Sequence, residues 1–356
     1  MSQWSIPSDR EQLQFLKNIQ RLLDEGSFVA SYKFALLHAL ADLAVTEGDD
    51  SGAPLPLSTR QISEQFIKLY WQQVRPFRNA NTVNGVLLRQ NAGKQASVVT
   101  HLHRAHSSVA GSLFRMQQET RAWRKLVSDV DSTVRMMPLW KLQTVGNERI
   151  EFLYANQDRG GVIKLKPGVA YCMRTFHPML CGLFRAAWID FLRHANASEL
   201  GAGDDLQEFL FGHERGSLDF YKSILFEVQS GECFYCKREM GEGGDVDHFI
   251  PWSRCHSDLA HNFVLAHRGC NNAKSDHLAF EKHLEAWVER NSSRREELEQ
   301  RYSVSAVVHD ANTSARIATW AYSCAEQAHG QVWIRGKEFK HLDDSWRDLL
   351  WVAAAS

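Results

Sequence analysis

Apolar and polar residues recur at helical spacing through the first part of the chain. A capping-box pair, Ser8 and Glu11, precedes apolar positions that return every three or four residues up to Gly26, which predicts a helix. The segment 32–45 is apolar nearly all round, which predicts a buried helix. The N-terminal part is therefore expected to be mainly α-helical. Further helices are predicted from the Ser58–Gln61 capping box onward, at 109–126 and at 177–195.

A different pattern interrupts the helices between Glu148 and Lys166. Two short runs rich in β-branched and aromatic residues flank a Gly-Gly pair, which predicts a β-hairpin. Residues 196–205 are polar and contain glycine, which is typical of a linker. We therefore expect a mainly helical recognition or interaction domain over 1–200 and a linker over 201–215.

Beyond this linker, apolar segments alternate with polar segments that contain cysteine. Helices are predicted at 217–229, 280–290 and 314–328. The fold class predicted for the whole chain is α+β. We expect a small compact module over 216–290, braced by a helical support region over 291–356.

The composition is that of a globular protein. The 356 residues are 44% hydrophobic and include 11 Trp and 19 Phe, which stay ordered by burying large surfaces. The first residues lack the pattern of a secretory signal, and no stretch of 18 apolar residues predicts a membrane span. We expect a cytoplasmic protein, so its seven cysteines favour reduced thiols or metal ligands over disulfides.

Charge is balanced overall but not locally. Lys and Arg number 41 against 42 Asp and Glu, yet residues 65–118 contain no acidic residue. The basic residues there either form a surface that attracts phosphate groups or lie on a solvated face with counter-charges from elsewhere in the fold. The candidates for contacts with nucleic acid in this stretch are Arg75, Arg78, Arg89 and Arg104.

Two pairs of metal-ligating residues lie about thirty residues apart. Cys233 and Cys236 form the first pair, and His267 and Cys270 form the second at the same spacing. Together they supply the four N and S ligands of a closed tetrahedral zinc site, which leaves no position for a substrate and is therefore structural. Cys255–His256 offers substitute ligands that we rank below His267.

The residues between and after these pairs have a distinctive order. The stretch DVDHFIPWS contains Asp247 and His248, Asn262 follows alone, and the second pair runs into Asn271-Asn272-Ala273-Lys274. This order resembles that of the HNH endonucleases, in which a cysteine knuckle, an Asp-His pair, a lone Asn and a second knuckle follow one another. The resemblance covers residues 233–274.

The resemblance implies a ββα-metal fold and a role for each matching residue. His248 corresponds to the general base that activates a water, and Asn262 to the residue that holds the loop and this ring in position. Asp247 and Asn271 correspond to the ligands of a catalytic divalent cation. Many members have His where Asn271 stands, so the sequence departs from the commoner pattern there.

The residue types suit phosphodiester hydrolysis on chemical grounds as well. A histidine with a pKa near neutrality can deprotonate a water, and a hard cation can neutralise the charge that gathers on the leaving oxygen. Carboxylate and amide oxygens favour Mg²⁺ or Mn²⁺, so two different metals are expected, with Zn²⁺ as the structural one. Lys274 and Arg268 either contact phosphate or are ordinary surface charges.

The sequence therefore predicts a metal-dependent HNH endonuclease that hydrolyses DNA. One such site cuts one strand, so cutting both requires a homodimer or two successive nicks. A restriction or anti-phage effector is the setting that the resemblance suggests, and a partner protein or a small-molecule activator would fit it. The alternatives are a non-catalytic, zinc-containing DNA- or protein-binding regulator and a nuclease that acts on RNA.

Overall fold

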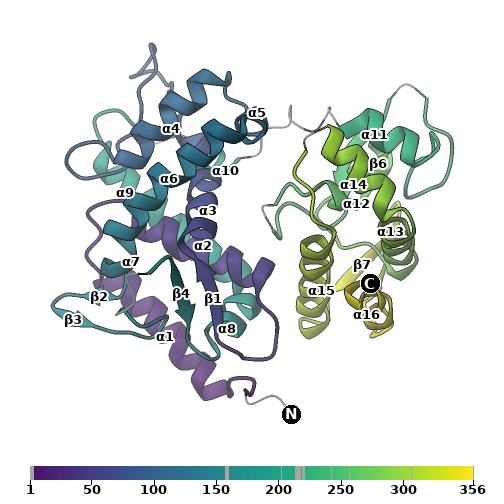
Figure 1. The fold of residues 1–356 in the computed structure, drawn as a ribbon, viewed down its shortest axis with the longest axis horizontal. Coiled ribbons are helices and arrows are strands. Elements are labelled where there is room, and N and C mark those ends of the chain that lie inside the picture. Colours follow the sequence, from purple (N-terminus) through teal and green to yellow (C-terminus); the bar gives the residue numbers. More distant parts are fainter. Residues whose placement is uncertain are drawn as a thin grey trace. The chain divides into compact units, whose positions relative to one another are not determined.

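The chain forms two compact units, residues 1–213 (unit 1) and 214–356 (unit 2), and each is described by itself (Figure 1). The structure is a computed structural model that describes residues 4–156, 160–201, 203–212, 218, 221–241, 243–255, 257–305 and 307–355. Within these residues, no helix combines the length and the apolar character that a membrane crossing requires.

Unit 1 is mainly helical, as the sequence predicts, with two small antiparallel sheets. Its helices are α1 (Asp9–Glu25), α2 (Tyr32–Glu47), α3 (Thr59–Trp71), the 3-10 helix η1 (Gln72–Val74), α4 (Ser97–Ser108), α5 (Leu113–Gln118), α6 (Thr120–Met136), α7 (Pro138–Lys141), α8 (Val169–Thr175), α9 (His177–Ala195) and α10 (Leu206–Phe211). Its strands are β1 (Leu55–Ser58), β2 (Thr144–Val145), β3 (Glu148–Arg149) and β4 (Val162–Leu165).

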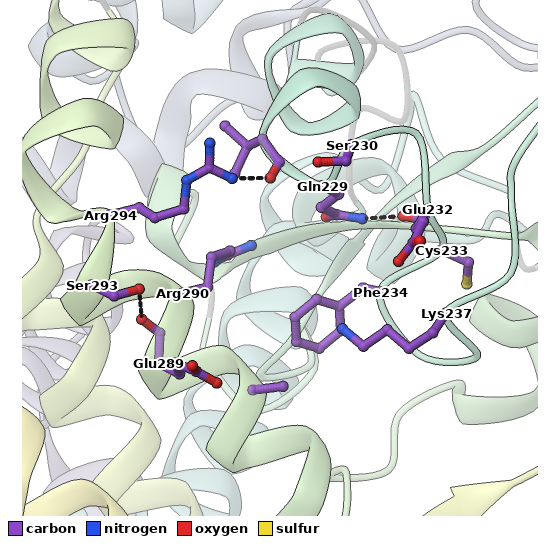
Figure 2. A pocket seen from close by; sticks show the side chains of 12 residues that line it. Gln229, Ser230, Glu232, Cys233, Phe234, Lys237, Glu289, Arg290, Ser293 and Arg294 are labelled. Carbon is purple, nitrogen blue, oxygen red and sulfur yellow. Dashed lines mark hydrogen bonds between the residues drawn. The ribbon is translucent and has the colours of Figure 1, made fainter.

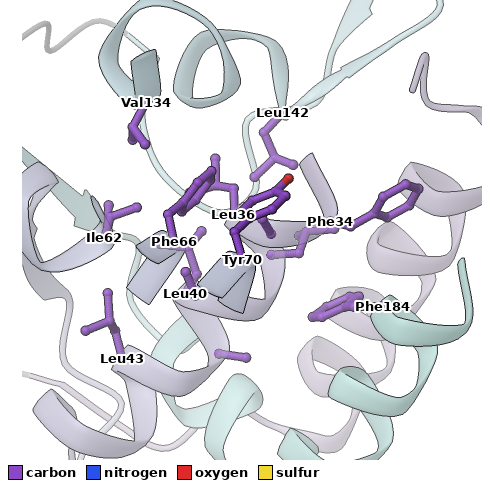
Figure 3. Packing of buried hydrophobic residues seen from close by; sticks show 14 of the residues in the cluster. Phe34, Leu36, Leu40, Leu43, Ile62, Phe66, Tyr70, Val134, Leu142 and Phe184 are labelled. Atoms are coloured by element: carbon purple, nitrogen blue, oxygen red, sulfur yellow. The ribbon is translucent and has the colours of Figure 1, made fainter. Parts of the chain in front are cut away.

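The core of unit 1 surrounds α2. Both predicted capping boxes are confirmed, at Ser8 and at Ser58, where the serine side chain accepts from the third helical N–H. α2 is buried from Lys33 to Thr46, and α3, α8 and α9 pack on it. Figure 3 shows Leu36 and Leu40 of α2 among the aromatic side chains of this core.

Two predictions for unit 1 are wrong in detail. The helix predicted over 109–126 is two helices, α5 and α6. Glu119 between them has a ψ of 68°, which is not helical and interrupts the helix. Among the described residues, which leave out 157–159, the two runs of the predicted hairpin form no paired strands and are joined by an isolated bridge between Tyr154 and Leu165. β4 pairs instead with β1, in a register that places Leu57 opposite Ile163 and buries both.

The segment predicted as a linker is partly structured. Residues 206–211 form α10, which begins at the capping residue Asp205. Leu206 and Leu210 are buried in the core of unit 1. Asp204 accepts a hydrogen bond of 2.6 Å from the Asn79 side chain, so this end of unit 1 is fixed to its interior. The local sequence does not predict these contacts, because the two buried leucines stand among polar residues and glycine, which are typical of a linker.

Unit 2 contains a two-stranded sheet with a helix beside it, enclosed by longer helices. Its elements are α11 (Tyr221–Val228), β5 (Asp245–His248), the 3-10 helix η3 (Ala260–Asn262), β6 (Phe263–Ala266), α12 (Arg268–Lys274), α13 (Glu281–Ser293), α14 (Arg295–Val304), α15 (Ala311–Gln327), β7 (Gln331–Arg335), β8 (Glu338–His341) and α16 (Trp346–Ala355). β5 and β6 are antiparallel, and α12 follows β6 directly, which gives the ββα order that the resemblance implies.

The small ββα segment has its apolar contacts with the surrounding helices. Phe249, one residue after β5, stacks on Trp287 of α13 with ring centroids 5.1 Å apart. Tyr235 of the cysteine loop packs edge-on against Trp333 of β7. Two strands of four residues are marginally stable alone, so this packing is needed to keep β5 and β6 in place.

Truncation of a core leucine tests the packing around α2. Leu40→Ala removes a fully buried side chain and leaves a cavity, so we expect the free energy of unfolding to fall by about 2–5 kcal/mol. Leu13→Ala on the exposed face of α1 is the matched control, with an expected change within about 0.5 kcal/mol. Urea unfolding followed by circular dichroism measures both. Equal effects would contradict this description of the core.

Candidate active site

The four predicted zinc ligands come together. The ligand atoms of Cys233, Cys236, His267 and Cys270 all lie within 4.8 Å of one another. The Cys236 Sγ is 3.3 Å from the His267 Nδ1. In a tetrahedral zinc site, an S ligand and an N ligand lie about 3.5 Å apart. The donor set therefore fits zinc. Cys255 is buried outside this cluster, and His256 lies outside the described residues.

The surroundings of the cluster suit a structural zinc ion. His267 Nε2 lies 3.1 Å from the carbonyl oxygen of Glu239, which can fix the ring with Nδ1 toward the cluster. Burial raises the pKa of Cys236, but hydrogen bonds from Arg238 and its cysteine and histidine neighbours outweigh this and lower it to about 6. Burial and the nearby thiolates raise the pKa of Cys270 to about 12. A bound dication relieves this mutual repulsion between thiolates.

The pairing of β5 with β6 places Asp247 and His248 at the end of the ladder. His248 lies opposite Phe263, and Asp247 lies opposite Val264. Asn262 fixes the chain just beyond, because its side chain accepts from the Ile250 N–H at 2.8 Å and donates to the Ile250 carbonyl at 3.0 Å. Asn262 thus has the geometry of a residue that holds the loop after His248.

Asp247 is held by two buried donors. Its Oδ2 accepts a hydrogen bond of 2.5 Å from the Tyr235 hydroxyl and lies 3.1 Å from the Lys274 Nζ. Desolvation and the negative charge of Asp247 raise the pKa of Tyr235 well above its usual value, so this hydroxyl keeps its proton and donates it. The Asp247 side chain is only 9% exposed, so little water reaches it.

Lys274 lies inside the module and not on its surface. Its side chain is fully buried, and besides Asp247 its Nζ donates to the His248 carbonyl at 2.9 Å. The sequence suggested a phosphate contact for this lysine, whereas the structure directs its ammonium group inward. Arg268, the other candidate, is 80% exposed and 3.4 Å from Asp245, so it can reach a ligand in solvent.

His248 contacts a carboxylate that the sequence did not single out. Its Nε2 is 2.8 Å from the Oδ1 of Asp258, whose side chain is 39% exposed. The imidazole ring also packs against Phe263 and Trp252, with centroids 4.8 and 5.5 Å away. The ring is therefore held by a contact with a carboxylate and by packing against two aromatic side chains.

Asn271 lies on α12, three residues before Lys274. Residues three apart share one face of a helix, so Asn271 is on the face of α12 that Lys274 directs at β5. Its side chain is half-buried. Amide and carboxylate oxygens, such as those of Asn271 and Asp247, are donor types that Mg²⁺ and Mn²⁺ prefer.

The four arginines of unit 1 that the sequence singled out, Arg75, Arg78, Arg89 and Arg104, differ in their surroundings. Arg75 lies over the Phe209 ring and bonds backbone carbonyls, so it is partly a structural residue. Arg89 is 45% exposed and pairs with Glu199 at 3.6 Å. Arg78 and Arg104 are exposed. The acid-free stretch thus receives at least one counter-charge from elsewhere in the fold, which was one of the two alternatives considered above.

Three residues that support the site were missed. Tyr235 lies within the first cysteine pair, Asp258 lies ten residues after His248, and Arg290 of α13 donates to the carbonyls of Phe263 and His261. None belongs to a spacing pattern, and only Tyr235 has a local signal, its position between two metal ligands. Figure 2 shows Arg290 and Arg294 across a cavity of about 400 Å³ from Cys233 and Phe234.

Comparison with known families agrees with this geometry. Residues 233–280 match the family model described as HNH endonuclease, which supports a nuclease function in general for this segment. Residues 12–205 match the family model described as a domain of unknown function (DUF8808). Since the second match spans more than half of the chain, the protein belongs to that family. No curated protein and no solved structure matches the chain.

The buried ion pair gives the sharpest test of the site geometry. Lys274→Met leaves Asp247 with a buried, uncompensated charge, so we expect the free energy of unfolding of unit 2 to fall by about 3–5 kcal/mol. Arg268→Met removes an exposed charge from the same helix and should change it by less than about 1 kcal/mol. Denaturant unfolding compares the two. A Lys274→Met protein as stable as the Arg268→Met control would refute the inward placement of Lys274.

Proposed function

We propose that unit 2 hydrolyses phosphodiester bonds in DNA at a site formed by Asp247, His248 and Asn271. One observation carries this proposal: an Asp-His pair at the end of β5 lies next to α12, and a zinc-type cluster joins the loop before β5 to the start of α12. The Asp-His pair, α12 and the cluster could each serve another purpose alone, but the segment that matches the HNH endonuclease model contains all three.

His248 serves as the general base in this proposal. The contact between its Nε2 and the Asp258 carboxylate favours the tautomer with hydrogen on Nε2, which leaves the lone pair on Nδ1. The lone pair accepts the proton of a water that attacks phosphorus. Asp258 also stabilises the imidazolium that results, as a carboxylate does for a catalytic histidine in acyl transfer.

Asp247 and Asn271 would hold the catalytic divalent cation, Mg²⁺ or Mn²⁺. When bound, such a cation stabilises the negative charge that develops on the scissile phosphate and its leaving oxygen. Lys274 contributes a second positive charge 3.1 Å from Asp247, which orients this carboxylate and partly neutralises it. Tyr235 fixes the same oxygen from the other side. Arg268, exposed at the start of α12, would bind a neighbouring phosphate in this proposal.

Unit 1 supplies recognition in this proposal. Its exposed arginines Arg78 and Arg104 lie in a stretch without acidic residues, which favours contact with a phosphate backbone. An HNH module joined to a separate recognition domain is the arrangement expected of a restriction or anti-phage nuclease. Foreign DNA is therefore the substrate that we favour.

A plasmid-nicking assay tests the activity. With Mg²⁺ or Mn²⁺ present, we expect the protein to convert supercoiled DNA to the nicked form, and His248→Ala to reduce the rate by about 10²–10⁴-fold because the general base is lost. His277→Ala, an exposed histidine of the same unit, is the matched control and should retain the parental rate.

The other outcomes separate the alternatives. Cleavage of labelled RNA but not of DNA would replace the substrate. Absence of cleavage by the parent protein together with retained DNA binding would favour a non-catalytic regulator. Cleavage unaffected by His248→Ala would contradict the assignment of the base.

A salt titration tests the role of unit 1. If Arg78 and Arg104 contact phosphates, the double variant Arg78→Gln, Arg104→Gln should bind DNA more weakly and lower the slope of log K against log salt by about two. Replacement of Arg75, which bonds backbone carbonyls, is the comparison for a structural effect. An unchanged salt slope in the double variant would remove these arginines from the interface.

A further inference from the structure

A second group of metal-ligating side chains lies in the core of unit 1, apart from the nuclease module. His38 and Asp42 are four residues apart on α2, and His177 and Cys181 are four apart on α9, which packs against α2. Residues four apart lie on one face of a helix, so each helix directs a pair of donors at the other. All four residues are buried, with whole-residue exposures between 0% and 6%.

Three of the four donor atoms form one compact group between the helices, and His177 lies beside this group, next to Asp42 and Cys181. The ligand atoms of His38, Asp42 and Cys181 lie within 4.8 Å of one another. His177 Nε2 is 2.8 Å from the Asp42 Oδ1 and 3.4 Å from the Cys181 Sγ. His38 Nδ1 is 3.0 Å from the Asp42 Oδ2. Two ligands of a tetrahedral zinc site with these donors lie about 3.3–3.8 Å apart, so the His177 ring, which is outside the 4.8 Å group, has to move toward His38 for all four donors to bind one cation.

The electrostatics of the group favour positive charge at its centre. The hydrogens that His38 and His177 share with Asp42 occupy the positions that a cation takes when it binds. With the Asp42 carboxylate and a Cys181 thiolate, a dication gives a neutral site, which is favoured in a buried environment.

We propose that His38, Asp42, His177 and Cys181 form a second structural metal site, which takes a divalent transition metal of the zinc type. Two imidazoles, one thiolate and one carboxylate are ligands that zinc accepts and that Mg²⁺ or Ca²⁺ does not prefer. Cys181 gives up its thiol proton to solvent, and each neutral imidazole keeps one hydrogen on the nitrogen that does not bind. All four positions are protein ligands, so the site is structural.

Arg185 already contacts one of the proposed ligands, His38, so metal binding has to be compatible with its positive charge. Its Nε donates to the His38 Nε2 at 3.1 Å, and its guanidinium also lies 5.3 Å from the centre of the Phe211 ring. When His38 binds metal through Nδ1, its Nε2 carries a hydrogen, so Arg185 gives up this contact and keeps the one with Phe211. The metal then crosslinks α2 to α9 in the middle of the unit 1 core, independently of the nuclease chemistry.

Metal content of the full-length protein tests the proposal. Protein grown with zinc and dialysed against metal-free buffer should contain about two zinc ions per chain by mass spectrometry, one for each four-ligand site. X-ray absorption at the zinc edge should then give about two sulfur ligands per zinc, the average of a Cys3His and a one-cysteine site. Both readings need only the parent protein, so they do not depend on whether a variant folds.

Variants assign the second ion. Cys181→Ser combined with His177→Gln should lose about one zinc per chain, and Cys233→Ser combined with Cys236→Ser should lose the other. Cys172→Ser, a buried cysteine of unit 1 outside the cluster, is the matched control and should keep both. One zinc per chain in the parent protein, about three sulfurs per zinc, or a second zinc that survives the Cys181 and His177 changes would overturn the proposal.

Discussion

The buried contact between Lys274 and Asp247 joins α12 to β5, and the geometry of the nuclease module depends on it. Strands of four residues have too few ladder hydrogen bonds to stay paired alone. Lys274 ties both the Asp247 carboxylate and the His248 carbonyl to the end of α12. Since an ammonium group without water must be paired, this contact specifies one arrangement of helix and strand.

The zinc-type cluster holds the other end of the ββα segment. The zinc-type cluster joins the loop before β5 to the start of α12, so both ends of the ββα segment are fixed. Asn262 then closes the loop after His248 through two hydrogen bonds to Ile250. The catalytic residues proposed here are therefore held by polar contacts, whereas the aromatic side chains of α13 and β7 supply the apolar burial that a segment this short lacks.

The same principle operates in unit 1 on a larger core. α2 is apolar apart from a few positions, among which His38 contacts Arg185 of α9 and Asp42 contacts His177 of α9. Buried polar groups must be satisfied, so these contacts fix the register of α2 against α9 in a way that leucine packing alone would not. Both units thus combine an apolar core with a small group of buried polar side chains.

The sequence by itself determined the helices with capping boxes, the buried character of α2 and the ligand order of the HNH segment, because these depend on residues close together along the chain. It could not determine that β4 pairs with β1, that Glu119 separates α5 from α6, or that Lys274 turns inward. Asp258 beside His248, and His177 beside Asp42, were equally hidden. These depend on contacts between distant residues, and only the tertiary structure decides which buried charge meets which partner.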